Sequence, residues 1–170
     1  MTGTLSKQEL QVGTLIAQTA DLANILQKKG WMMATAESCT GGMIAAACTD
    51  LAGSSVWFER GFVTYTNDAK IESLGVDAGL IAQHGAVSEE VARAMAEGAI
   101  AHSKAQVSVA VTGVAGPTGG SRDKPVGTVW FGWSVDGAVT SERMRFEGDR
   151  AAVRAATGCH ALRRLVDLLR

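Results

Sequence analysis

The sequence has too few cysteines and prolines, and too little net charge, for several classes of protein. Its three cysteines, Cys39, Cys48 and Cys159, show no Cys-x-x-Cys spacing, which argues against both a disulfide framework and a zinc site. Only two prolines and a hydrophobic content of 46% exclude a disordered chain. A net charge of −1 provides no field that would gather nucleic acid or an anionic membrane.

Long apolar runs are also absent. No apolar stretch reaches the length of a membrane span, and residues 1–8 are polar where a signal peptide needs an apolar segment. Together with the odd number of cysteines, these absences predict a cytoplasmic protein. A length of 170 residues fits one domain, so we expect a single domain over residues 1–170.

The sequence does contain 20 glycines and an alternation of helical and strand patterns. Helical spacing predicts helices over 6–29, from 43 to about 52, over 67–75, over 88–104 and after 149. Apolar and β-branched runs predict strands over 31–34, 57–65, 106–112, 126–135 and 138–146. Residues 80–86 are predicted to be a connector, with or without one further short turn. This order predicts an α/β fold: a three-layer α/β/α sandwich with a mostly parallel sheet. Asp136-Gly137 adds a late antiparallel hairpin.

The chain is organised around residues 36–42 (AESCTGG), between a predicted strand and a predicted helix. The glycines allow backbone to approach a ligand closely. The free N–H groups and the dipole of the following helix favour negative charge. Ser38 would therefore lie beside an anion or oxyanion site. The alternative is that Ser38 or Thr40 simply caps the helix.

A second glycine-rich loop, residues 113–121, follows the predicted strand 106–112. Because ligands bind at the carboxyl ends of strands in such sheets, the two loops could share one rim. Together they resemble a pocket for a phosphorylated ligand. Arg122 and Lys124 could meet a phosphate by charge, or they could be solvated loop charges.

Residues 65–70 (YTNDAK) lie between a strand and a helix, the latter capped by Asn67. A serine hydroxyl is a poor nucleophile until a base removes its proton. Lys70 can be that base if desolvation or nearby positive charge lowers its pKa, and Tyr65 can relay the proton. Spacing alone leaves open that Lys70 is a solvated surface lysine.

Other reactive side chains offer weaker alternatives. Cys39 competes with Ser38 for the nucleophile role, since a thiol at a helix N-terminus ionises readily. The three histidines, His84, His102 and His160, share no motif, so we predict structural roles for them and no metal site.

Two arginines, Arg150 and Arg154, lie four residues apart at the start of the closing helix. Side chains at this spacing lie on one face of a helix. We expect this face to be solvated, or its arginines to pair with Glu147 or Asp149.

Five segments then point to a family. Residues 36–42, 65–70 and 112–117 (TGVAGP), followed by 124–129 (KPVGTV) and 146–150 (FEGDR) with Arg154, resemble the successive signatures of the CinA C-terminal domain. The match runs in order over nearly the whole chain. Several long motifs in sequence are far more specific than one glycine pattern.

The resemblance implies a nicotinamide-nucleotide amidohydrolase, which hydrolyses the carboxamide of nicotinamide mononucleotide to nicotinic acid mononucleotide and ammonia without a cofactor. It implies an α/β/α fold, a homodimer, and Ser38, Tyr65 and Lys70 as catalytic residues. The partner would be a small pyridine nucleotide, with neither nucleic acid nor membrane. The expected substrate-binding residues are Glu37, Thr40, Gly41, Gly42, Asn67, Thr112, Gly113, Ala115, Gly116, Gly120, Arg122 and Lys124.

Within this hypothesis, backbone N–H groups near Thr40 to Gly42 stabilise the oxyanion, and the loop 113–121 holds the 5′-phosphate with help from Arg122 or Lys124. Two other functions stay open: a non-catalytic nucleotide-binding or sensing module, and an amidase for another small amide. A hydrogen bond from Ser38 to Lys70 or Tyr65 would favour an enzyme.

Overall fold

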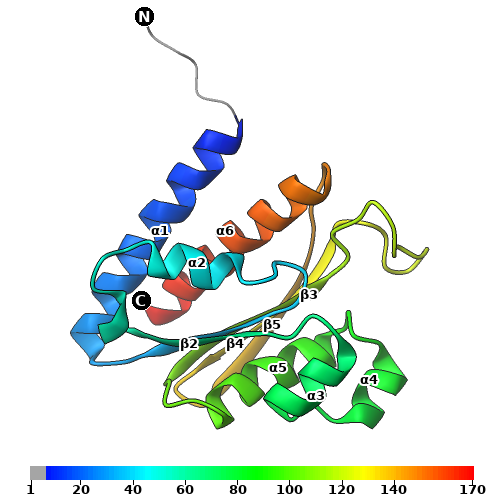
Figure 1. Ribbon diagram of the computed structural model, residues 1–170, viewed down its shortest axis with the longest axis horizontal. Coiled ribbons are helices and arrows are strands. Elements are labelled where there is room, and N and C mark those ends of the chain that lie inside the picture. Colours follow the sequence, from blue (N-terminus) through cyan, green and yellow to red (C-terminus); the bar gives the residue numbers. More distant parts are fainter. Residues whose placement is uncertain (1–6) are drawn as a thin grey trace, which may run out of the picture.

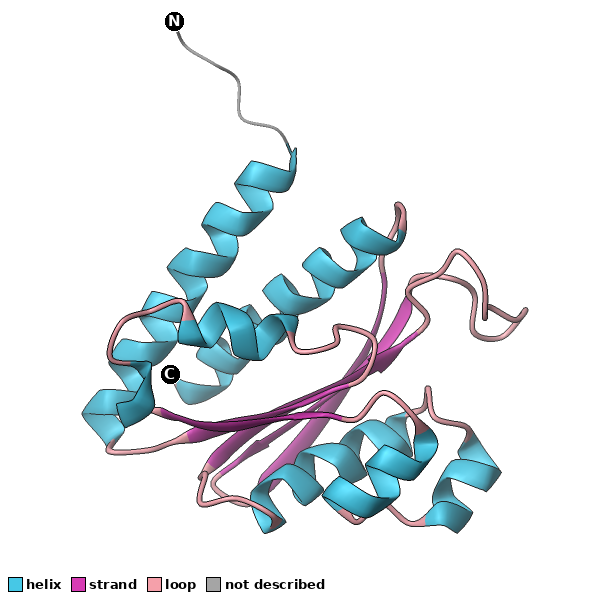
Figure 2. Ribbon diagram, in the orientation of Figure 1, coloured by secondary structure: helices cyan, strands magenta, loops and turns pink. Residues whose placement is uncertain are grey.

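The computed structural model describes residues 7–170, with side chains from residue 17 onward. A five-stranded sheet lies between two helical layers (Figures 1 and 2), with α1, α2 and α6 on one face and α3, α4 and α5 on the other. The elements are α1 (Lys7–Lys29), β1 (Met33–Glu37), α2 (Met43–Thr49), the 3-10 turn η1 (Ser54–Val56), β2 (Phe58–Val63), α3 (Asn67–Leu74), α4 (Ala78–His84), α5 (Glu89–Ala101), β3 (Val107–Gly113), β4 (Thr128–Val135), β5 (Ala138–Arg145) and α6 (Arg150–Leu169). No helix of the described chain is both long enough and apolar enough to cross a membrane.

The sheet has the strand order β2-β1-β3-β4-β5. β1 runs parallel to both β2 and β3, whereas β4 runs antiparallel to β3 and β5. Only β4 therefore opposes the other four strands, and the predicted α/β/α sandwich with a late hairpin is confirmed. Asp136 and Gly137 close that hairpin with φ of 49° and 83°, as the favoured two-residue hairpin turn requires.

The boundaries differ from the sequence-based expectation at several places. The predicted connector 80–86 overlaps α4, which begins at Ala78 and which Asp77 caps by accepting a hydrogen bond from the Leu80 amide at 2.8 Å. A seven-residue helix is too short to show a clear period. Thr66 rather than Asn67 caps α3, by accepting from the Ala69 amide. α5 ends at Ala101 rather than near residue 104.

β1 extends over Met33–Glu37, later than the predicted strand 31–34. All five of its residues are buried, because helices cover both faces of the sheet. Thr35 and Glu37 looked like the beginning of a turn in the sequence, yet they continue the strand. The start predicted for the first helix, residue 6, lies outside the described residues.

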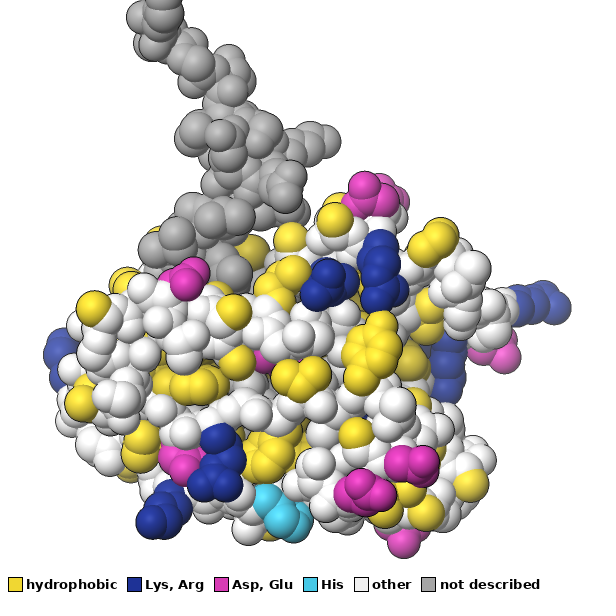
Figure 3. Space-filling view, viewed as in Figure 1, with side chains coloured by type: hydrophobic (Ala, Val, Ile, Leu, Met, Phe, Trp, Pro, Cys, Tyr) yellow, Lys and Arg dark blue, Asp and Glu magenta, His cyan; other side chains and the backbone are white. Residues whose placement is uncertain are grey.

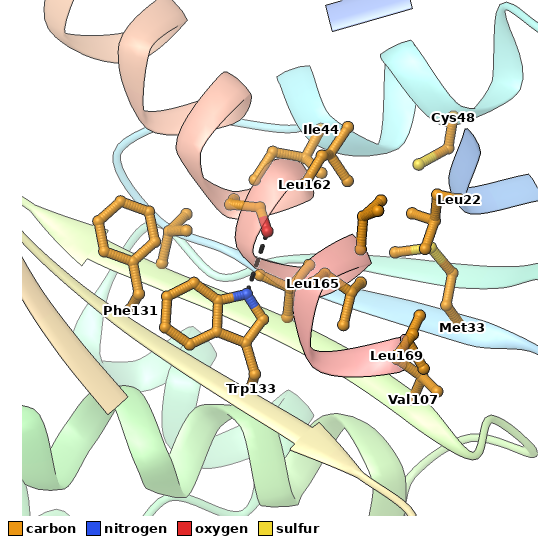
Figure 4. Packing of buried hydrophobic residues seen from close by; sticks show 14 of the residues in the cluster. Leu22, Met33, Ile44, Cys48, Val107, Phe131, Trp133, Leu162, Leu165 and Leu169 are labelled. Carbon is orange, nitrogen blue, oxygen red and sulfur yellow. Dashed lines mark hydrogen bonds between the residues drawn. The ribbon is translucent and has the colours of Figure 1, made fainter. Parts of the chain in front are cut away.

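The larger core cluster joins β3 and β4 to α1 and α6 (Figure 4). Phe131 and Trp133 of β4 stack with ring centroids 5.4 Å apart, and the Trp133 indole N–H donates to the Ala161 carbonyl of α6 at 3.1 Å. A buried indole N–H needs such a partner. This anchor holds α6 against the sheet and so helps to fix where its first turn, with Arg150, reaches the sheet edge.

Three parallel strands end side by side at that edge. Glu37 at the end of β1 pairs with Val63 of β2 and Val111 of β3, and the Ser38 amide donates to the Val111 carbonyl at 3.1 Å. The glycine-rich turn after β1 and the loop after β3 therefore share one rim, as predicted.

Candidate active site

A pocket of about 220 Å³ opens at this rim. Its walls come from the turn after β1, from α3 and the segment before it, from the connection between α4 and α5, from the end of β3 and from the start of α6. The lining residues are Ser38, Cys39, Tyr65, Asn67, Lys70, Ala86, Val87, Thr112, Gly113, Ala115 and Arg150.

Ser38 and Lys70 meet inside this pocket. The Lys70 Nζ lies 3.0 Å from the Ser38 Oγ and donates to the Thr64 carbonyl at 2.8 Å. Ser38 is only 9% exposed and Lys70 only 1%. Lys70 is therefore not the solvated surface lysine that spacing alone left possible, and its contact with Ser38 is the one that we expected of an enzyme.

Burial favours the neutral amine of Lys70 over its ammonium form. Removal from water lowers the pKa of its ammonium below the ordinary value of 10.5, while the neighbouring Cys39 has a smaller, opposite effect. Within residues 17–170, no carboxylate forms an ion pair with Lys70. The neutral amine can keep one N–H on the Thr64 carbonyl and present its lone pair to the Ser38 hydroxyl, which is the arrangement of a general base.

Tyr65 occupies the rim of the pocket rather than its floor. Its side chain is 57% exposed, and its hydroxyl accepts from the Arg150 guanidinium at 2.8 Å. Arg150 also donates to the Gly116 carbonyl at 3.0 Å. The structure shows no hydrogen bond from Tyr65 to Ser38 or Lys70 in the described chain, so Tyr65 and Arg150 form a second polar group beside the serine–lysine pair.

Arg150 is a pocket residue that the sequence analysis placed on a solvated helix face or beside Glu147 or Asp149. Arg154, one turn later, donates to the Thr40 carbonyl at 2.9 Å. Figure 3 shows basic side chains gathered over the first part of α6. The signal that could have identified Arg150 is its place in the motif 146–150, because the helix dipole disfavours a cation in the first turn of a helix.

Glu37 does not reach the pocket, contrary to its predicted role in substrate binding. It is fully buried, and its carboxylate accepts from the Thr40 hydroxyl at 2.6 Å and from the amides of Gly42, Ile44 and Ala45 at 3.1, 3.0 and 2.8 Å. The free N–H groups at the start of α2 are thus satisfied from within the chain. The prediction that Ser38 or Thr40 caps this helix is wrong, because Glu37 does so.

This arrangement also moves the predicted oxyanion site. The amide of Gly42 is bonded to Glu37, and the amide of Gly41 donates to the Ser38 carbonyl at 3.1 Å. No carbonyl or carboxylate of the described chain accepts from the amides of Cys39 and Thr40, and the Cys39 amide has only its own thiol as a partner. An oxyanion above Ser38 would therefore meet the beginning of the turn rather than its glycines.

Glu37→Ala should reveal how strongly this carboxylate supports the turn. The substitution leaves buried donors unpaired, so we expect the free energy of unfolding to fall by about 3 kcal/mol. Urea denaturation would measure the loss. Glu72→Ala, at an exposed position of α3, is the matched control and should change little; an equally small effect at Glu37 would contradict the capping role.

The other predicted binding residues divide into two groups. Asn67, Thr112, Gly113 and Ala115 line the pocket. Those that do not line it are Thr40, Gly41, Gly42, Gly116, Gly120, Arg122 and Lys124. Arg122 is exposed on its loop, and the Lys124 Nζ donates to the His84 carbonyl at 2.8 Å. Ala86 and Val87 were missed because they fall at the end of the predicted connector and just after it, and carry no polar side chain.

The remaining alternatives for the nucleophile and for a metal find little support. Burial raises the pKa of the Cys39 thiol to about 11, so this thiol stays protonated near neutral pH. None of the histidines lines the pocket. His84 contacts Glu90, His102 contacts the Gly98 carbonyl, and His160 contacts Glu142. Among the described residues, no group of three or more His, Cys, Asp and Glu side chains gathers as it would around a metal ion.

Comparison with known proteins adds the family context. The family model "CinA C-terminal domain" matches residues 16–169. A nicotinamide-nucleotide amidohydrolase PncC from Enterobacter agglomerans is 52% identical over 145 residues, which cover 85% of this chain and 88% of that protein. The protein of the same name from Pseudomonas putida is 54% identical over 147 residues, which cover 86% of this chain and 92% of that protein. The crystal structure of the competence/damage inducible protein CihA from Agrobacterium tumefaciens matches with a TM-score of 0.90 at 42% identity, covering 100% of both chains.

Proposed function

The chain belongs to the CinA C-terminal domain family, and from this we propose that it hydrolyses the carboxamide of nicotinamide mononucleotide to nicotinic acid mononucleotide and ammonia. The observation that carries the proposal is the contact of 3.0 Å between Ser38 and the buried Lys70. A serine hydroxyl in contact with a buried amine, inside a pocket, supports the roles of nucleophile and base that we propose. Relatives that are more than half identical and named for this activity support the choice of substrate.

The reaction follows from the positions of these groups. Lys70 takes the proton of the Ser38 hydroxyl as the Oγ attacks the carboxamide carbon, and the amides of Cys39 and Thr40 stabilise the oxyanion. The protonated Lys70 then gives its proton to the leaving nitrogen, and the C–N bond breaks to release ammonia. Water, deprotonated by Lys70, attacks the acyl-enzyme; the ester bond breaks, and Ser38 recovers its proton as the acid leaves.

Tyr65 and Arg150 have a binding role in this proposal. Because the Tyr65 hydroxyl accepts from Arg150, its own proton is available for a substrate oxygen. The Arg150 guanidinium lies beside the Gly116 carbonyl at the mouth of the pocket. Its fork of donors suits a phosphate, so we assign the 5′-phosphate to Arg150 in place of Arg122 or Lys124.

The two rival functions make different demands on the site. A sensing module would need both glycine-rich segments but no buried lysine beside Ser38. An amidase for another small amide would use the same pair but would have no need of Arg150 at the mouth of the pocket.

Ammonia release should therefore depend on the phosphate of the substrate and on Arg150. We expect the wild-type protein to prefer nicotinamide mononucleotide to nicotinamide riboside, and Arg150→Met to lower kcat/KM for the nucleotide about 10- to 100-fold, the value of a charge-assisted hydrogen bond. The value of kcat/KM for nicotinamide riboside should fall less in this variant. Arg122→Met, which removes an equal charge from the exposed loop, is the control. Binding of the nucleotide without any ammonia release by the wild-type protein would favour the sensing module.

A further inference from the structure

The connection between α4 and α5 supplies one wall of the pocket, through Ala86 and Val87. This short segment lies outside the regular hydrogen bonding of both helices apart from the Gly85 amide, which donates to the Ile81 carbonyl. Its position therefore depends on hydrogen bonds from side chains. Thr112 at the end of β3 donates to the Ala86 carbonyl at 2.8 Å. Ser88 donates to the Gly85 carbonyl at 2.8 Å.

Lys124 completes this set by donating to the His84 carbonyl at 2.8 Å. Three successive carbonyls, those of residues 84, 85 and 86, therefore each accept from a side chain; Lys124 and Thr112 come from distant parts of the chain, and Ser88 from the segment itself. A buried or half-buried carbonyl without a partner is unfavourable. The carbonyl of Ala86 and the two carbonyls before it are thus all held, and Lys124 is the only one of the three donors that carries a charge.

The surroundings of Lys124 favour this contact over a solvated position. The His84 carbonyl lies at the C-terminal end of α4, where the helix dipole favours a cation. No carboxylate in the described chain forms an ion pair with Lys124. Gly85 has a φ of +77°, and a Cβ there would lie 3.2 Å from the Lys124 Nζ, so the absence of a side chain at Gly85 makes room for the ammonium.

The backbone around Lys124 is also fixed. Its amide donates to the Ser121 hydroxyl at 3.1 Å, and the Ser121 amide donates to the Lys124 carbonyl at 3.0 Å. A few residues on, the Gly127 amide donates to the Val114 carbonyl at 2.8 Å, which closes the base of the glycine-rich loop. Lys124 therefore connects an anchored loop with a wall of the pocket across 40 residues of sequence.

We propose that Lys124 is a positioning residue, which acts through the His84 carbonyl to hold the Ala86–Val87 wall against the substrate. It is not a ligand of the phosphate. The kinetic part of this inference rests on the proposed function, because it uses nicotinamide mononucleotide as the substrate. Since the wall contacts the bound substrate and not the bond that breaks, loss of Lys124 should weaken binding more than chemistry.

Lys124→Met should therefore raise KM about tenfold and change kcat by no more than about twofold. The mononucleotide and the riboside should be affected by the same factor, because the wall does not distinguish them by charge. Lys124→Arg can still donate to the His84 carbonyl and should recover most of the affinity. Arg122→Met, which removes a charge from an exposed position of the same loop, should leave KM unchanged.

Amide hydrogen exchange tests the inference without any substrate. In Lys124→Met the amides of residues 85–88 should exchange faster than in the wild-type protein, whereas Arg122→Met should leave them unchanged. Unaltered exchange together with unaltered KM would overturn the positioning role. A rise in KM for the mononucleotide with no rise for the riboside would make Lys124 a phosphate ligand instead. If the wild-type protein releases no ammonia, the proposed function fails, and the exchange result alone decides the role of Lys124.

Discussion

Ser38→Ala is expected to lower kcat/KM for nicotinamide mononucleotide by roughly 10⁴-fold or more, because it removes the atom that attacks the carboxamide. The fold should tolerate the change. Ser38 is nearly buried, and its Oγ bonds to Lys70, which keeps the Thr64 carbonyl as a second partner. The melting temperature and the affinity for the mononucleotide should therefore remain close to those of the wild-type protein. Ammonia release and thermal unfolding, measured side by side, check both parts.

Cys39→Ala is the matched control, since it alters the adjacent side chain of the same pocket. A thiol whose pKa burial raises to about 11 is no nucleophile at neutral pH, so this variant should keep most of the activity. Mass spectrometry during turnover of a slowly hydrolysed amide should find the acyl group on Ser38. An adduct on Cys39, or activity that survives in Ser38→Ala, would remove the serine from the mechanism.

The parts of this site that could be predicted are those that depend on local sequence. The turn 36–42 is marked by its own glycines, and the central strand β3 is marked by its apolar, β-branched composition. Parallel strands necessarily end at one edge, so the meeting of the turn after β1 with the loop after β3 followed from the element order. Lys70 came from its motif, and the structure adds the contact with Ser38 that spacing could not supply.

The parts that could not be predicted depend on where long side chains reach. Glu37 belongs to a strand buried on both faces, and nothing in its neighbours tells that its carboxylate turns inward to α2 rather than outward to a ligand. Arg150 meets Tyr65 across 85 residues. Lys124 lies beside a glycine-rich loop, where charge suggests a phosphate, but its flexible stem carries the ammonium to the end of α4.

Lys70→Met is the second substitution with a large expected effect, and we expect it to lower kcat by roughly 10³-fold, since a general base contributes on the order of 10² to 10⁴. The Met side chain has a similar length and no charge, so the pocket should keep its shape. The affinity for the mononucleotide should change far less than kcat. A variant that binds poorly but turns over normally would contradict the role of base.

The same lysine gives the activity a predictable pH dependence. Catalysis needs the neutral amine, so kcat/KM of the wild-type protein should rise with pH and level off above the pKa of Lys70. Burial lowers that pKa below 10.5, so the plateau should begin at a pH below the one at which an ordinary lysine loses its proton. The slow residual reaction of Lys70→Met should lack this rise. A wild-type profile that climbs all the way to the ordinary lysine range would show that Lys70 is protonated in the resting enzyme.

The lowered pKa of Lys70 should also make the free energy of unfolding depend on pH, in a direction that can be worked out. Because the pKa of Lys70 is lower in the folded than in the unfolded chain, the unfolded chain binds more protons at pH values between the two. The difference in the free energy of unfolding, wild type minus Lys70→Met, should therefore rise with pH across that window. Below the pKa of Lys70 in the folded chain this difference should be constant. Burying an unpaired cation is unfavourable, so Lys70→Met should be at least as stable as the wild-type protein near neutral pH. Urea unfolding of both proteins from pH 6 to 10.5 tests this: a variant less stable by the same amount at every pH would mean that Lys70 supports the fold through packing, and that its charge state is not what the site controls.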